Sequence, residues 1–131
     1  MEYVTDTHAL MWYTQPRKSR LGKRAASLFE EAEEDRTLIY VPSVVLWELA
    51  DQLGQGTLRL RQRFDHWCRA LDSKQGFQIQ PLLWEDVNEA RGLPFDDPFD
   101  CLIAGTALRM GVPLITKDTV ISEFGLVETV W

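Results

Sequence analysis

Short β-like runs alternate with helical stretches along the whole chain, and this order constrains its fold more than any other feature. The runs, three to five residues long and mostly apolar, span residues 3–5, 38–41, 77–79, 112–116 and 126–130. Strands that alternate with helices are typical of βαβ units with a parallel sheet. The pattern therefore predicts an α/β fold with a central, mainly parallel sheet. The length of 131 residues suits a single domain over residues 1–131.

The helical stretches are bounded by residues that start or stop helices. Ser19 can cap the second helix, and Gly54 and Gly56 can end the third. Asp97 is a good N-cap because Pro98 follows at the first helical position. With apolar residues at helical spacing, these signals predict helices over residues 9–13, 20–35, 44–53, 60–71, 84–91 and 99–110.

Four acidic residues stand close to the predicted ends of strands. Asp6 follows the first strand directly, and Asp118 follows the strand over residues 112–116. Glu48 and Asp100 are predicted in the first turns of helices that begin at the same edge of the sheet. Because sites in open α/β sheets form beyond the carboxyl ends of the strands, all four carboxylates can converge there.

Each of these acids also has an ordinary structural explanation. Asp6 can cap a helix that begins near residue 7, and Asp118 can begin a turn. Asp97 and Asp100 can favour a helix dipole from the first turn, by about 0.3–1 kcal/mol each. Glu48 is harder to explain in this way, because its helix is apolar nearly all round and supplies no lysine or arginine. A glutamate in a buried helix needs a partner.

A cluster of these four carboxylates requires a cation or protons. Two like charges about 4 Å apart repel by about 4 kcal/mol at an effective dielectric near 20. Oxygen ligands without histidine or cysteine select hard ions, so the expected ion is Mg²⁺ or Mn²⁺. Such ions activate water and favour in-line displacement at phosphorus. Spacing alone does not separate this metal site from four ordinary structural acids.

The charge of the chain bears on its partners. The net charge is −6, which by itself argues against nucleic-acid binding. Two basic runs oppose that argument, although each is also compatible with a solvated helix or loop face. They comprise Arg17, Lys18, Arg20, Lys23 and Arg24 in the first run and Arg59, Arg61 and Arg63 in the second.

Other sequence features favour a cytoplasmic protein. We find no signal peptide and no run of about 18 apolar residues, so no membrane segment is expected. Cys68 and Cys101 stand outside any zinc-binding spacing. We interpret them as reduced, buried thiols.

Four motifs around the acids resemble those of VapC-type toxins, which are PIN-domain ribonucleases. The first reads VTDTHALMW over residues 4–12, and the second reads PSVVLWELA over residues 42–50. The third and fourth read DPFDCLIA over residues 97–104 and LITKD over residues 114–118. The motifs occur in the family's order and span nearly the whole chain, so the ordered set is far more specific than any one motif.

The resemblance implies a PIN-like three-layer fold, with a central sheet flanked by helices. It also implies a metal-dependent endoribonuclease that acts as the toxin of a type II toxin–antitoxin pair, is masked by a small antitoxin protein, and forms a homodimer. The family's four metal-binding, catalytic acids correspond to Asp6, Glu48, Asp100 and Asp118. Thr7 and Thr116 match hydroxyl positions that support these acids.

The chain departs from the family at three positions where many relatives carry basic residues or histidine. These positions hold Phe95, Asp96 and Cys101, which puts RNA affinity and rate in question. Asp97 is interpreted as a helix cap, with a place in the metal shell as the alternative. His8 could be a general base, but we interpret it as a structural histidine or as one at the rim of the site.

We therefore hypothesise an Mg²⁺- or Mn²⁺-dependent ribonuclease. One alternative is a PIN-fold module that binds an antitoxin or RNA without cutting. Another is a metal-dependent phosphohydrolase that acts on DNA or on small phosphate esters. The sequence does not identify the RNA target, the number of metal ions or the antitoxin.

Overall fold

Five parallel strands form the centre of the computed structural model, which describes residues 1–15 and 20–131. The sheet order is β3-β2-β1-β4-β5, and every neighbouring pair is parallel. The predicted α/β fold with a parallel sheet is confirmed. The strands are β1 (Glu2–Thr5), β2 (Leu38–Pro42), β3 (Phe77–Gln80), β4 (Leu114–Ile115) and β5 (Thr129–Val130).

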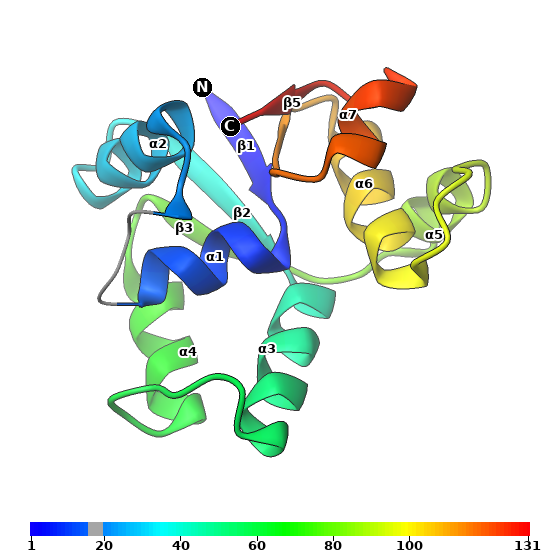
Figure 1. Cartoon of the computed structure of the whole chain (residues 1–131). Coiled ribbons are helices and arrows are strands. Elements are labelled where there is room, and N and C mark those ends of the chain that lie inside the picture. Colours follow the sequence, from blue (N-terminus) through cyan, green and yellow to red (C-terminus); the bar gives the residue numbers. More distant parts are fainter. Residues whose placement is uncertain (16–19) are drawn as a thin grey trace.

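Seven helices lie around this sheet in the described residues. Figure 1 shows α1, α2 and α4 on one side of the sheet and α5, α6 and α7 on the other, which gives three layers. None of the helices in residues 1–15 and 20–131 is long and apolar enough to cross a membrane. The helices are α1 (Thr7–Thr14), α2 (Lys23–Glu33), α3 (Ser43–Gln55), α4 (Phe64–Ser73), α5 (Trp84–Ala90), α6 (Pro98–Met110) and α7 (Thr119–Phe124).

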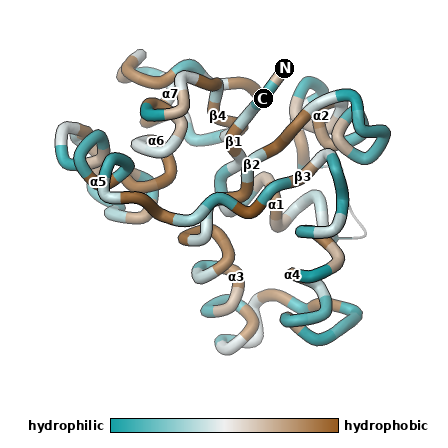
Figure 2. Tube along the Cα trace, turned by 180° about the vertical axis from the view of Figure 1, so that it is seen from behind, coloured by the Kyte–Doolittle hydropathy of each residue, from teal (hydrophilic) through white to brown (hydrophobic). Residues whose placement is uncertain are grey.

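The core lies on both faces of the central strands. Val4 and Ile39 are fully buried, as expected for parallel strands that helices cover on both sides. Figure 2 shows hydrophobic residues along β1 and β2 and hydrophilic residues on the outer turns of α2 and α5. Beside the sheet, Tyr13, Phe29 and Phe77 stack on one another and join α1, α2 and β3.

The strand order reverses at β1, and this reversal positions the site. The chain moves from β1 to β2 and β3 in one direction and then returns to add β4 and β5 on the other side of β1. The carboxyl ends of β1 and β4 are therefore neighbours, with Thr5 opposite Ile115. In open α/β sheets a crevice forms at such a switch point.

Two helix boundaries differ from the prediction. Gly54 does not stop α3, which continues to Gln55 and ends at Gly56. Gly56 has a φ of 77°, a left-handed conformation that glycine adopts without strain. α4 begins at Phe64 rather than near residue 60, because Leu58 is buried and Leu60 half-buried in a non-helical connection.

Other differences concern α2, α7 and the last two strands. α2 begins at Lys23, with Gly22 rather than Ser19 at the N-cap; Ser19 itself lies outside the described residues. The sequence did not predict α7, where only a turn was expected after residue 118. The last two strands are shorter than predicted, with two residues each.

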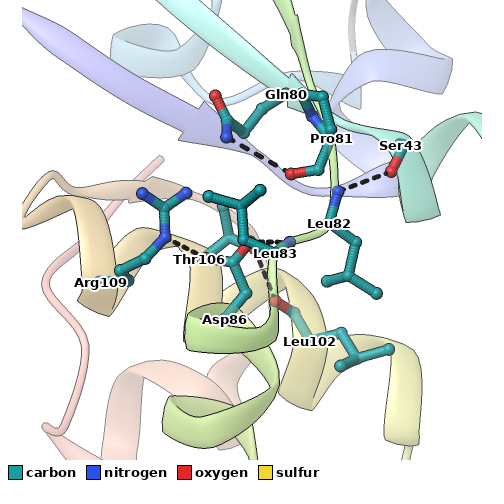
Figure 3. A network of polar contacts seen from close by, with 9 residues as sticks. All are labelled: Ser43, Gln80, Pro81, Leu82, Leu83, Asp86, Leu102, Thr106 and Arg109. Atoms are coloured by element: carbon teal, nitrogen blue, oxygen red, sulfur yellow. Dashed lines mark hydrogen bonds and ion pairs between the residues drawn. The ribbon is translucent and has the colours of Figure 1, made fainter.

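A close helix pair, α5 and α6, supports the element that carries Asp100. Gly105 on α6 packs against the backbone of α5; a Cβ there would lie 2.7 Å from the carbonyl oxygen of Asp86. Asp86 is fully buried and accepts a hydrogen bond from Arg109 on α6 (Figure 3). Backbone contact and this ion pair together fix α5 against α6.

Candidate functional site

Asp6 is held in place from both sides of the strand-order reversal. Its backbone follows β1, and its Oδ1 accepts a hydrogen bond from the Ala9 N–H at 2.8 Å, which confirms the predicted helix cap. Its Oδ2 accepts a hydrogen bond from Thr116 Oγ1 at 2.6 Å, just beyond β4. The side chain is only 8 % exposed. Its carboxylate is therefore fixed at the junction of β1 and β4.

Glu48 reaches the same region from α3. It is the sixth residue of that helix, so it lies in the second turn and not in the predicted first turn. The prediction of a helix buried nearly all round is also wrong, because Trp47 is 62 % exposed. The partner that the sequence required is a hydroxyl rather than a cation, since Thr7 Oγ1 donates a hydrogen bond to Glu48 Oε1. Thr7 thus orients Glu48 beside Asp6.

Asp97 and Asp100 occupy the start of α6 in different roles. Asp97 is the N-cap, as predicted, and its Oδ1 accepts hydrogen bonds from the N–H groups of Phe99 at 2.8 Å and Asp100 at 3.4 Å. Within the described part of the chain, the Asp100 carboxylate has no hydrogen bond or ion pair and is half-buried. Asp100 is therefore the acid with the most freedom to bind a ligand.

Asp118 is the N-cap of α7. Its Oδ1 accepts hydrogen bonds from the N–H groups of Val120 at 2.8 Å and Ile121 at 3.3 Å. Its own N–H donates to Thr116 Oγ1 at 3.0 Å, and that hydroxyl in turn donates to Asp6. Thr116 therefore connects the two acids that follow β1 and β4.

One cavity of about 460 Å³ collects all four of the predicted acids. Asp97 and Thr7 also line it, whereas Thr116 supports it from behind through Asp6. His8 is exposed and lines the cavity, which fits the second of its two interpretations, a rim histidine, and not a buried structural one. The complete lining is Asp6, Thr7, His8, Trp12, Glu48, Asp97, Asp100, Lys117, Asp118 and Thr119.

Sequence reasoning missed the role of Lys117 in this cavity. Lys117 is the only lysine or arginine among the described residues that line it. Its Nζ lies 5.5 Å from the centroid of the Trp12 ring, a cation–π contact that holds the ammonium over the ring face. Its position directly before Asp118 was the available signal, but nothing local places it beside Trp12.

Nearly the whole chain matches a known protein family. The profile of the PIN domain matches residues 3–126. The chain belongs to the PIN domain family. No curated protein sequence matches it, but solved structures share the fold of this PIN domain over nearly its whole length.

Three solved structures are similar to this PIN domain. VapBC2 from Rickettsia felis, bound to a promoter DNA fragment, has a TM-score of 0.68 and 17% identity and covers 99% of this chain and 98% of that one. A toxin–antitoxin complex from Klebsiella pneumoniae and FitAcB from Neisseria gonorrhoeae each have a TM-score of 0.65 and 18% identity. Each of these two covers 98% of this chain and 96% of the other. At this identity the similarity establishes the fold.

Burial and mutual repulsion raise the pKa values of three acids in the PIN-domain cavity. Burial is the main cause of the raised pKa of Asp6 and of Glu48. The pKa of Asp100 rises from 3.8 to about 7, first through burial and then through the charges of Asp97, Asp118, Glu48 and Asp6. The cavity therefore favours a proton or a cation over bare carboxylates.

The chemistry of these side chains fits a hard divalent cation. The acids offer oxygen ligands only, which Mg²⁺ and Mn²⁺ prefer. No ion pair among the described residues neutralises any of the four acids. In residues 1–15 and 20–131, however, no three acidic, histidine or cysteine side chains are close enough to hold one ion as they stand. Donor type thus favours a metal, whereas binding one requires side-chain rearrangement.

The raised pKa of Asp100 predicts a loss of stability as pH rises. Between pH 4 and pH 7 the folded protein holds a proton on Asp100 that the unfolded chain has released, so the free energy of unfolding falls through this range. Below pH 4 both states are protonated and the difference vanishes. In EDTA, the Asp100→Asn protein should gain about 1–2 kcal/mol over wild type between pH 4 and pH 7, after allowance for partial exposure.

Urea unfolding at several pH values measures this gain. Asp72→Asn is the matched control, because Asp72 is exposed on α4, away from the cavity. If the gain in the free energy of unfolding does not vary with pH, the raised pKa assigned to Asp100 is wrong.

Proposed function

We propose that this PIN domain is a metal-dependent endoribonuclease and the toxin of a type II toxin–antitoxin pair. One observation carries the proposal: acids from four separate segments line one cavity at the carboxyl edge of the sheet. Bringing these carboxylates together does not stabilise the fold, because the pKa values of three of the acids are raised. Structures retain repulsive clusters of this kind mainly where they serve a function.

The four acids Asp6, Glu48, Asp100 and Asp118 would hold one or two Mg²⁺ or Mn²⁺ ions, directly or through water. When bound, such ions activate water and stabilise negative charge at phosphorus. In the net reaction, a water oxygen forms a bond to phosphorus while the bond from phosphorus to the sugar oxygen breaks. The leaving oxygen takes a proton.

The chain's own residues prepare this reaction. Thr116 and the Ala9 N–H fix the two oxygens of Asp6, and Thr7 orients Glu48. Lys117 presents its ammonium at the cavity and can neutralise one phosphate oxygen of the substrate. It can compensate in part for the basic residues absent at positions 95, 96 and 101.

The proposed partners rest on similar structures and on exposed surface. The similar structure from Klebsiella pneumoniae is a toxin–antitoxin complex. On this chain, Trp47, Leu83 and Trp84 are exposed apolar residues of α3 and of the start of α5, which supports an apolar contact with a partner protein. We propose an antitoxin and a homodimer.

Light scattering of the purified chain tests the dimer, for which a monomer mass at micromolar concentration would be contrary evidence.

A binding module without nuclease activity is the second candidate. It is favoured by the absence, within the described residues, of three ligands already close enough for one ion, and by the single cation that lines the cavity. Such a module would bind RNA or an antitoxin and leave RNA intact.

Metal dependence of cleavage tests the nuclease directly. We expect cuts in a pool of structured and single-stranded RNA with Mg²⁺ or Mn²⁺ and none in EDTA, because bare carboxylates repel phosphate. Single-stranded DNA and a small phosphate ester, assayed in parallel, separate a ribonuclease from the other phosphohydrolases. Intact RNA in every lane would favour the binding module.

A further inference from the structure

A second cavity lies beyond the other end of α1, and the proposed reaction does not use it. It has a volume of about 420 Å³. Thr14 and Gln15 line it from the end of α1, residues 59–62 line it from the connection between α3 and α4, and Trp67 lines it from α4. Unlike the acid cavity, it has no acidic residue among the described residues that line it.

The cavity carries unneutralised positive charge. Arg59 and Arg61 are exposed, and neither has an acidic partner among the residues that the structure describes. Arg63, the third arginine of this basic run, differs because it pairs with Asp65 at 3.1 Å. Two of the three arginines therefore remain available for an anionic ligand, and planar guanidinium groups bind phosphate oxygens well.

Packing positions the two arginines. Buried and exposed residues alternate over residues 58–61. Leu58 is 4 % exposed and Leu60 is half-buried, whereas the arginine that follows each of them is exposed. This alternation anchors the connection through its leucines and leaves the arginines at the cavity. Trp67 packs partly against the core and adds an aromatic surface, and Gln62 adds an amide.

The two cavities lie at opposite ends of α1. Thr7 and His8 line the acid cavity, and Thr14 and Gln15 line the basic one. Thr14 follows Thr7 by seven positions, which is about two helical turns and about 10 Å along the axis of α1. About 10 Å is the length of a few nucleotides of a single strand, so one strand that lies along α1 (Figure 1) is long enough to contact both cavities.

We propose that this basic cavity binds the phosphodiester backbone of single-stranded RNA a few nucleotides from the bond that is cut. The inference rests on the proposed function and adds a substrate contact to it. A chain with net charge −6 repels a polyanion on average. Among the described residues, the acid cavity supplies only Lys117 against that repulsion. Arg59 and Arg61 supply the missing attraction, and an aromatic surface beside cations is typical of single-strand binding.

RNA binding at several salt concentrations tests the proposal. The probe is a fluorescein-labelled single-stranded RNA of about 16 nucleotides. All proteins carry Asp100→Asn and are assayed with Mg²⁺, so that the strand is bound but not cut. In this background, Arg59→Gln/Arg61→Gln should raise Kd about tenfold at low salt and reduce the slope of log K against log salt by about 1.4, which is 0.7 per lost phosphate contact.

Lys23→Gln/Arg91→Gln is the matched control, because it removes the same charge from exposed positions on α2 and after α5. If the two double variants have the same Kd for RNA and the same salt slope, the proposal is wrong. An acidic peptide would then be the better candidate ligand of the cavity. Unchanged thermal midpoints show that both variants fold. If wild type cuts no RNA but the Arg59→Gln/Arg61→Gln protein still binds less tightly than the control, the nuclease proposal fails and this RNA site stands.

Discussion

The Asp100→Asn protein should retain its fold and lose RNA cleavage by at least about 100-fold. Asp100 has no structural hydrogen bond among the described residues, and its pKa is raised to about 7 by burial and by four neighbouring acids. Its carboxylate therefore contributes repulsion to the folded state and, under the proposed function, a metal ligand to the site. Asparagine is nearly isosteric but carries no charge. Cleavage of the same RNA pool with Mg²⁺ measures the effect.

Two further variants make this result specific. Asp96→Asn removes a charge from an exposed residue that does not line the cavity, so cleavage should persist. Asp97→Asn should also keep much of the activity, because asparagine caps helices as well as aspartate does. Wild-type rates in the Asp100→Asn protein would exclude this cavity as the nuclease site. A loss of activity together with a lower thermal midpoint would instead indicate damage to the fold.

The Arg109→Leu protein should be destabilised by about 3–5 kcal/mol. Arg109 donates a hydrogen bond to the carboxylate of Asp86, which is 0 % exposed. The same carboxylate also accepts a hydrogen bond from the Leu83 N–H at 2.9 Å (Figure 3). Leucine would leave that buried charge with no cation. Chemical unfolding at pH 7 measures the change in the free energy of unfolding.

Matched variants separate the ion pair from loss of the arginine side chain itself. Arg91→Leu changes an exposed arginine directly after α5 and should shift stability by less than about 0.5 kcal/mol. The double variant Asp86→Asn/Arg109→Leu should be less destabilised than Arg109→Leu, because no unpaired charge remains. A change below about 1 kcal/mol in Arg109→Leu would show that the pair does not hold α5 on α6.

Local signals were sufficient for most of the helices and strands, although not for α7. Asp97 with Pro98 predicted the start of α6, and Asp6 was recognised both as a helix cap and as an acid at a strand end. These features depend on hydrogen bonds and periodicities within about four residues, which the sequence displays directly. The order of strands and helices also sufficed for the α/β class.

Contacts between distant residues could not be predicted in the same way. Glu48 was expected to need a partner, but only packing of α1 against α3 shows that the partner is Thr7, 41 residues away. Likewise, α4 begins late because Leu58 and Leu60 are packed in the connection before it, and Lys117 meets Trp12 only in the folded chain.

The sequence by itself thus determined the alternating α/β order and the caps at Asp6 and Asp97, because short-range hydrogen bonding and side-chain periodicity fix these features. The choice of the four acids came from the four ordered motifs around them. Tertiary structure alone decided how the acids share one cavity, since Thr116 reaches Asp6 across 110 residues through the pairing of β1 with β4. It also decided the raised pKa of Asp100. Burial and charge proximity depend on distances in space, which residue order along a chain does not specify.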